Sequence, residues 1–118
     1  MNGHELLIDI TTDKVSTELL KDVDDAKLLM LEIVRKLNLN VVKFVYHQFK
    51  NDNGENYGAT GLLLLSESHL TIHTYIDSRM ASINIYTCNP QTPLYDAIDV
   101  IQNFYGKETK INFKEISR

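Results

Sequence analysis

Residues 59–86 read ATGLLLLSESHLTIHTYIDSRMASINIY, and this stretch decides the fold of the chain. It holds three apolar segments, Ala59–Leu65, Leu70–Tyr75 and Met80–Tyr86, which are separated by short polar turns. The first segment is almost entirely apolar, as in a central strand, and the other two alternate with the period of two that is typical of β-strands. The stretch therefore predicts three neighbouring strands of one sheet.

Further strands flank this stretch on both sides. Residues 3–10 and 109–116 also alternate, and Val41–Phe49 is rich in Val, Phe and Tyr, which favour strands. Lys50–Tyr57 (KNDNGENY) is built from turn-forming residues around Gly54, so we expect a loop there.

Two amphipathic helices are predicted as well. The first has one apolar face whose residues recur at steps of three and four: Leu19, Val23, Ala26, Met30, Ile33 and Leu37. The second is expected to begin with Thr92 as its cap and Pro93 at its first helical position, and to end at Gly106. Its expected buried face consists of Leu94, Ala97, Ile98, Ile101 and Phe104.

The resulting order is β-α-β-β-β-β-α-β. It predicts an α+β fold, a two-layer sandwich in which a mostly antiparallel sheet carries two helices on one face. A length of 118 residues fits a single domain over residues 1–118. The chain has no third layer for the other face of the sheet, so we expect a second copy to cover it.

Composition narrows the class of protein. Hydrophobic residues make up 43% and charged residues 24%, which excludes a disordered, collagen-like or coiled-coil chain. A net charge of −4 argues against a nucleic-acid or membrane-surface partner, because both need clustered cations. The sequence has one cysteine, Cys88, and shows neither a secretory signal nor a long apolar run. These features lead us to expect a cytoplasmic protein.

Ser68, His69, His73 and Cys88 are the residues that could carry chemistry. On an extended strand His69 and His73 would lie about 13 Å apart, too far to bind one metal ion, so no metal site is expected. Ser68 and His73 would be about 16 Å apart and no Gly-x-Ser-x-Gly turn is present, which argues against a serine hydrolase. Without further information these residues read as a polar turn, two surface histidines and a small core thiol.

The block Glu67-Ser68-His69-Leu70-x-Ile72-His73-Thr74, followed by Thr87-Cys88, resembles the small bacterial and archaeal pyruvoyl-dependent type of S-adenosylmethionine decarboxylase proenzyme. The resemblance covers most of the chain. It includes Gly3, Leu6 and Asp9 in the first strand and Ala59-Thr60-Gly61 before the block.

The resemblance implies that the chain cuts itself between Glu67 and Ser68, into a β chain of residues 1–67 and an α chain of residues 68–118. The Ser68 hydroxyl would attack the Glu67 carbonyl, and elimination and hydrolysis would leave a pyruvoyl group in place of Ser68. Thr60 would hydrogen-bond the tetrahedral intermediate of the first step. His73 would remove the α-proton in the elimination.

The pyruvoyl group would then be the covalent cofactor. By the same resemblance, its ketone forms a Schiff base with the amine of S-adenosylmethionine and accepts the electrons released as CO2 leaves. Cys88 would return a proton to that carbon, a role that suits a thiol of pKa about 8.5. The product would supply aminopropyl groups for spermidine synthesis.

One part of the pattern departs from the family. Where the family has Trp-Pro-Glu, this chain has Tyr75-Ile76-Asp77. The family's Glu binds the ribose hydroxyls, so Asp77 is the expected counterpart. The ring that stacks on adenine would be Phe49, with Tyr57 as the competing candidate. Arg79 could bind the substrate carboxylate or be a surface arginine.

Two alternatives to S-adenosylmethionine decarboxylation stay open from the sequence. The same catalytic residues could serve a pyruvoyl-dependent arginine or ornithine decarboxylase, or the domain could be a regulatory or binding module that does not process itself.

The spacing of the catalytic residues also bears on assembly. Ser68 and His73 do not meet along one strand. Either the chain folds sharply at the cut site or His73 comes from a second copy, and the duplicated eukaryotic members of the family favour the second. We therefore predict a homodimer in which Ser68 and Cys88 of one protomer meet Thr60, His73 and Asp77 of the other.

Overall fold

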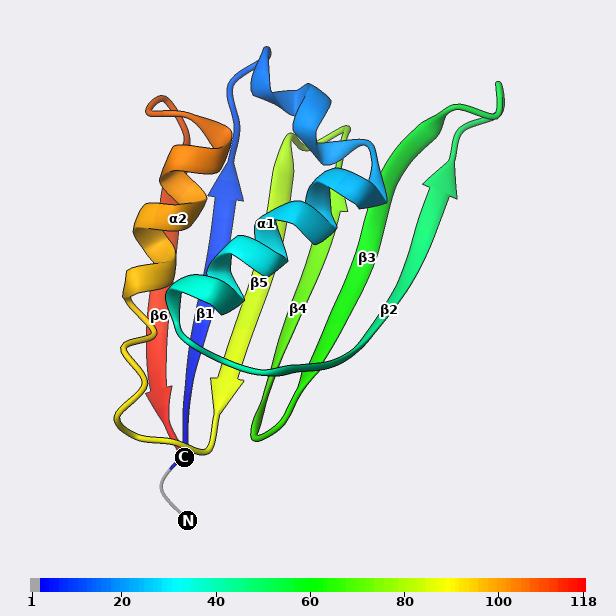
Figure 1. The fold of residues 1–118 in the computed structure, drawn as a ribbon. Coiled ribbons are helices and arrows are strands. Elements are labelled where there is room, and N and C mark those ends of the chain that lie inside the picture. Colours follow the sequence, from blue (N-terminus) through cyan, green and yellow to red (C-terminus); the bar gives the residue numbers. More distant parts are fainter. Residues whose placement is uncertain (1–2) are drawn as a thin grey trace.

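The computed structural model describes residues 3–118 as one antiparallel sheet with two helices on one face (Figure 1). The elements in chain order are β1 (His4–Thr11), the 3-10 helix η1 (Ser16–Leu20), α1 (Val23–Lys36), β2 (Val41–Lys50), β3 (Asn56–Leu65), β4 (Ser68–Tyr75), β5 (Met80–Thr87), α2 (Asp96–Tyr105) and β6 (Lys110–Ser117). The predicted α+β two-layer sandwich is confirmed.

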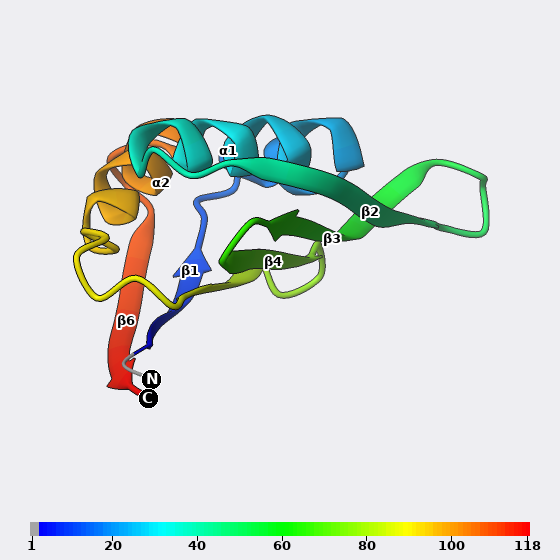
Figure 2. The ribbon, with the colours of Figure 1, turned by 60° about the horizontal axis from the view of Figure 1, so that its bottom comes forward.

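The sheet has the order β2-β3-β4-β5-β1-β6, and every neighbouring pair is antiparallel. The three strands predicted from residues 59–86 are therefore neighbours, as expected. β1 lies between β5 and β6 although it comes first in the chain. Figure 2 shows the helices as one layer above the sheet, with the β2–β3 hairpin extending beyond it.

The core lies between the sheet and the two helices. Strand residues facing the helices are almost fully buried, for example Leu6, Ile8, Leu70, Ile72 and Ile83. Packing here is close, because a Cβ added at Gly61 would lie 3.1 Å from Sδ of Met30 in α1. A side chain at Gly61 would therefore require the Met30 and Ile72 side chains to shift by a few tenths of an ångström.

The prediction of one long first helix was wrong at its start. Residues 16–36 form two helices, η1 and α1, because Asp22 between them is extended, with φ −97° and ψ 136°. Its carboxylate accepts a hydrogen bond from Nδ2 of Asn56 at 2.6 Å, and Oε1 of Gln48 accepts one from the Val23 N–H at 2.6 Å. These contacts come from the β2–β3 hairpin, so local periodicity could not reveal them.

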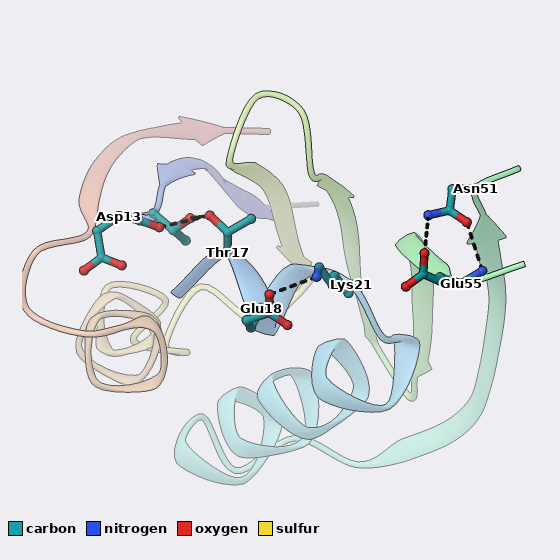
Figure 3. Close-up of polar contacts among 7 residues, drawn as sticks. Asp13, Thr17, Glu18, Lys21, Asn51 and Glu55 are labelled. Carbon is teal, nitrogen blue, oxygen red and sulfur yellow. Dashed lines mark hydrogen bonds and ion pairs between the residues drawn. The ribbon is translucent and has the colours of Figure 1, made fainter. Parts of the chain in front are cut away.

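η1 is held at both ends by short-range polar contacts, several of which are drawn in Figure 3. Oδ1 of Asp13 accepts a hydrogen bond from the Ser16 N–H at 2.7 Å, and the Thr17 hydroxyl donates to the Asp13 carbonyl at 3.0 Å. Lys21 and Glu18 form an ion pair at 2.8 Å.

The second helix begins later than predicted. α2 starts at Asp96, and the expected cap Thr92 lies before it in a turn. In this turn the Asp96 N–H donates to the Pro93 carbonyl and the Ala97 N–H to the Leu94 carbonyl, so both bonds span three residues and not four. The predicted end is confirmed, since Gly106 follows the helix with φ +108°. Leu94, Ala97 and Ile101 are buried as expected, Ile98 and Phe104 only partly, and the buried Tyr105 was missed.

The predicted loop at Lys50–Tyr57 is shorter than expected, because β2 and β3 extend into it from both sides. Only residues 51–55 form the turn. Oδ1 of Asn51 accepts hydrogen bonds from the N–H groups of Asn53 and Glu55, and its Nδ2 donates to the Glu55 carboxylate (Figure 3).

The sheet face opposite the helices, called the open face below, is covered by no element of residues 3–118 (Figure 2). The strand registers place a row of polar side chains across the middle of this face. In sheet order the row consists of His47, Thr60, His73, Ser82, Asp9 and Asn112. Neither described α-helix combines the length and the hydropathy needed to cross a membrane.

Candidate active site

The end of the sheet where β4 begins brings together three of the predicted residues. Ser68 pairs with Thr87 across β4 and β5, so the Glu67–Ser68 bond lies beside Cys88. The backbone N–H of Cys88 donates a hydrogen bond of 3.0 Å to the carbonyl oxygen of Glu67. This N–H therefore polarises the carbonyl that the resemblance marks as the point of attack.

Ser68 itself is buried, with 7% of its surface exposed. Its hydroxyl oxygen has no hydrogen-bond partner among residues 3–118, which is uncommon for a buried hydroxyl and leaves its lone pairs free. A pocket of about 350 Å³ adjoins it, lined by polar residues from the loop after α1 and from the end of β5, among them Asn38, Asn40 and Asn89.

Cys88 is half-buried, and its thiol donates to the hydroxyl of Tyr86 across 3.7 Å. The hydrogen bond with Cys88 raises the pKa of Tyr86, and partial desolvation adds to the shift. Tyr86 was not among the predicted site residues. A signal was available, because Cys88 directly follows β5 and a residue two positions earlier in an extended chain lies on the same side.

Thr60 and His73 form a second group on the open face. They pair in register across β3 and β4, and the Thr60 hydroxyl lies 3.0 Å from Nδ1 of His73. His73 is five residues along β4 from Ser68, about 16 Å, and the burial pattern of β4 turns the two side chains to opposite faces. Within one chain the serine and the histidine do not meet.

Asp77 and Phe49 lie at the far end of the sheet from the cut site. Both line a pocket of about 340 Å³, together with Tyr57 and Tyr75. The Tyr57 hydroxyl donates a hydrogen bond to Oδ1 of Asp77, and this bond raises the pKa of Tyr57. Phe49 is half-exposed and packs edge-on against the ring of His47, with 4.6 Å between ring centroids.

The predicted site residues thus fall into two sets in one chain. Glu67, Ser68 and Cys88 lie at one end of β4 and β5, whereas Thr60, His73, Asp77 and Phe49 lie toward the other. Arg79 is exposed in the β4–β5 turn, where its carbonyl accepts a hydrogen bond from the Thr12 N–H. That position gives no support for binding a substrate carboxylate.

Comparison with known proteins gives matches over nearly the whole chain. The sequence profile of the S-adenosylmethionine decarboxylase family matches residues 4–118. A relative from Aquifex aeolicus named S-adenosylmethionine decarboxylase proenzyme is 33% identical over 104 residues, covering 88% of this chain and 69% of the relative. A relative of the same name from Acidithiobacillus ferrooxidans is 32% identical over 104 residues, covering 88% of this chain and 73% of its own length.

A solved structure is similar as well. The crystal structure of the adenosylmethionine decarboxylase from Aquifex aeolicus superposes with a TM-score of 0.80 at 29% sequence identity. The match covers 98% of this chain and 89% of that one.

Proposed function

Because the chain belongs to the S-adenosylmethionine decarboxylase family, we propose that it removes CO2 from S-adenosylmethionine with a pyruvoyl group made from its own Ser68. The family and the names of the relatives favour this substrate over arginine or ornithine, and favour an enzyme over a binding module. Self-cleavage at Glu67–Ser68 would divide the domain into a β chain of 67 residues and an α chain of 51 residues.

The observation that carries the proposal is the geometry of the Glu67–Ser68 bond. An unbonded buried hydroxyl follows directly after a carbonyl that is already held by the Cys88 N–H. Attack of the Ser68 oxygen on the Glu67 carbonyl carbon forms a C–O bond. The C–N bond then breaks, the serine nitrogen gains the hydroxyl proton, and an ester remains. The Cys88 N–H would stabilise the negative oxygen of the intermediate, a contribution worth about 10²–10³ in rate for one such donor.

Elimination of the ester requires a base for the Ser68 α-proton, and we propose His73 of a second copy for this role. The Thr60 hydroxyl, 3.0 Å from Nδ1 of His73, would hold the orientation of the imidazole. The same threonine would hydrogen-bond the tetrahedral intermediate. Within one chain His73 lies about 16 Å along β4 from Ser68, so a homodimer related by two-fold symmetry would supply His73 and Thr60 to each cut site. Because the Ser68 side chain is turned to the helix side, the partner's His73 would approach the Ser68 α-carbon from the open face, at the end of the sheet where β4 begins.

The open face is the surface through which we propose that the two copies pack. It carries exposed apolar side chains, including Val45, Leu62 and Leu64, which a second sheet would bury. Some polar groups of the row already have hydrogen-bond partners within one chain. The Thr60 hydroxyl bonds to His73, and the Ser82 hydroxyl donates to Asp9 at 2.8 Å. Such internal pairs lower the cost of burying polar groups.

The residues around the cut site fit a pyruvoyl group, since such a group derives from a serine whose hydroxyl is free to attack. The group would supply an electron-withdrawing carbonyl that takes up the electron pair released as CO2 leaves. The Cys88 thiol would protonate the product carbon, while Asp77 and Phe49 would hold the ribose and the adenine. The product is suited to aminopropyl transfer in spermidine synthesis. A reducing cytoplasm would keep Cys88 as a free thiol.

The proposal is tested by intact mass and by release of labelled CO2. We expect the purified protein to consist of two pieces of 67 and 51 residues, the second blocked by a keto acid, and to release CO2 from carboxyl-labelled S-adenosylmethionine. Ser68→Ala should stay intact and inactive. Ser66→Ala is the matched control, because Ser66 lies in the same turn but is exposed, and it should be cleaved normally.

An intact wild-type chain that releases no CO2 would contradict the proposal and return the domain to the binding-module class. Release of CO2 from labelled arginine or ornithine, with none from S-adenosylmethionine, would keep the cofactor and overturn the substrate.

A further inference from the structure

Asp77 is the residue on which nucleoside binding depends in the proposed function, and its side chain is poorly held by its own turn. It lies in the exposed four-residue turn between β4 and β5, which is closed by a hydrogen bond of 3.1 Å from the Arg79 N–H to the Ile76 carbonyl. The turn uses backbone groups only, so it leaves the carboxylate free to rotate.

Tyr57 supplies the contact that holds this carboxylate. Within residues 3–118, Asp77 accepts one side-chain hydrogen bond, from the Tyr57 hydroxyl to Oδ1. The bond joins neighbouring strands, because Tyr57 lies in β3 and Asp77 follows β4. Since the bond raises the pKa of Tyr57, the hydroxyl remains a donor throughout the neutral range.

A local irregularity of β3 brings Tyr57 to this place. Gln48 pairs with Ala59 and Lys50 with Asn56, so β3 contains one extra residue at this point, which is a β-bulge. Gly58 lies in the bulge with φ +110°, and its carbonyl accepts a hydrogen bond of 2.8 Å from Nε2 of Gln48. A bulge changes the direction of the side chains beside it, and it is a built feature that fixes the position of Tyr57.

We propose that Tyr57 is a positioning residue for nucleoside recognition: it orients the Asp77 carboxylate so that Oδ2 faces the pocket and accepts the ribose hydroxyls of the substrate. This role rests on the proposed function and extends it to a residue outside the motif.

The test measures the binding of 5′-methylthioadenosine to the purified protein by titration calorimetry. This nucleoside lacks the amino acid portion of the substrate. Tyr57→Phe keeps the ring and removes the hydroxyl, and it should weaken binding about tenfold, the effect of one hydrogen bond to a charged group. Tyr46→Phe is the matched control, because Tyr46 is exposed on β2 away from this pocket, and it should bind like the wild type.

Two further readouts separate positioning from a merely structural effect. The 2′,3′-dideoxy form of the same nucleoside should bind equally to wild type and Tyr57→Phe, because it lacks the hydroxyls that Asp77 would accept. Tyr57→Phe in an Asp77→Ala background should have no additional effect, since the two residues act as a pair. In turnover assays KM for S-adenosylmethionine should rise about tenfold with kcat and self-cleavage unchanged.

Equal binding of 5′-methylthioadenosine by wild type and Tyr57→Phe, in a protein that decarboxylates S-adenosylmethionine, would overturn the inference and leave the proposed function standing. Equal weakening of both nucleosides would overturn it too, because the hydroxyl would then act on the base. A wild-type protein that neither binds the nucleoside nor releases CO2 would overturn the proposed function and this inference with it.

Discussion

Ser66 and Ser68 flank the same glutamate, yet the fold treats them very differently. Ser66 is exposed and its N–H donates to the Asn40 carbonyl, whereas the Ser68 hydroxyl is buried and unbonded among the described residues. Burying a hydroxyl without a partner costs about 1–3 kcal/mol. A cost of this kind at one residue is typical of a functional position, and in the proposed cleavage it would keep the attacking oxygen free of competing bonds.

In the proposed mechanism Cys88 acts through two different groups, its thiol and its backbone N–H, and a substitution can separate them. Cys88→Ala removes the thiol but keeps the N–H that holds the Glu67 carbonyl. We therefore expect this variant to be cleaved into two pieces but to lose about 10²–10⁴ in decarboxylation rate, the usual contribution of a positioned acid. Intact mass and CO2 release measure the two effects.

Cys88→Ser is the matched control for that prediction, since it keeps the shape and the backbone and replaces only the acidic thiol. Turnover should be lost in it as well. A Cys88→Ala chain that stays intact would show that the thiol, and not the N–H, is needed for the cut.

Asp13 provides a pH-dependent contribution to stability. The hydrogen bond from the Ser16 N–H lowers the pKa of Asp13 below 3.8. A lowered pKa in the folded state means that the ionised carboxylate stabilises the fold at pH values above 3.8 and that this contribution disappears as the pH falls through the folded pKa. Asp13→Ala should therefore unfold at lower urea concentration than wild type at neutral pH, with the gap closing in acid.

Asp13→Asn is the control, because its side-chain oxygen can still accept from the Ser16 N–H without a charge. It should lose less stability than Asp13→Ala. A gap between wild type and Asp13→Ala that stays constant down to strongly acidic pH would contradict the assignment.

At the scale of elements, the bulge in β3 is the feature that links the fold to the site. Gly58 has φ +110°, and a Cβ there would lie 3.0 Å from the Thr74 carbonyl oxygen. Gly58→Ala should lower the free energy of unfolding by about 1–3 kcal/mol, the range for a strained backbone conformation. It should also weaken nucleoside binding, because Tyr57 is the preceding residue. Chemical unfolding and calorimetry measure both.

Gly54→Ala is a matched control for the bulge. Gly54 also has positive φ, +77°, but it lies at the tip of the hairpin where a Cβ would meet nothing within 4 Å. It should cost less stability and leave nucleoside binding unchanged. Equal losses in both variants would mean that backbone strain alone, and not the fit against Thr74, matters at Gly58.

Element by element, the sequence predicted what local periodicity encodes. The alternation in residues 59–86 correctly predicted three neighbouring strands, and Gly106 correctly marked the end of α2. The break at Asp22 could not be predicted, because it depends on Asn56 and Gln48 from a distant hairpin. Thr92 was expected to cap the second helix, but the chain first makes three-residue turns from Pro93 and Leu94, so α2 itself begins only at Asp96.

The candidate site shows the same limit. The motif supplied the candidate residues, and strand spacing correctly predicted that Ser68 and His73 stay apart in one chain. The sequence could not reveal the hydrogen bond from Tyr57 to Asp77, because that bond depends on a one-residue bulge. Nor could it reveal the bond from the Cys88 N–H to the Glu67 carbonyl, because that bond depends on the register of β4 against β5.

For the whole molecule, a shared site predicts that two inactive variants restore each other. Cys88→Ala and Asp77→Ala should each be deficient as homodimers. When equal amounts are unfolded and refolded together, half of the dimers should be mixed, and each mixed dimer should contain one intact site. Recovered activity should therefore approach about one quarter of wild type, measured as CO2 release.

Cys88→Ala refolded with itself is the control and should recover nothing. If Cys88 and Asp77 served a site within one chain, every site in the mixture would lack one of them, and the mixture would be no more active than its components.

The position of β1 has a consequence for a severed chain. β1 belongs to the first 67 residues but lies between β5 and β6, which both belong to the last 51. The two fragments would pair with each other at three strand boundaries, β3–β4, β5–β1 and β1–β6. They could therefore separate only if the hydrogen bonds between these strands broke. Gly3 and Arg118 are also adjacent, since the Arg118 N–H donates to the Gly3 carbonyl at 2.8 Å. A circular permutant that starts at Ser68 and joins residue 118 to residue 1 would therefore be expected to keep the same strand order.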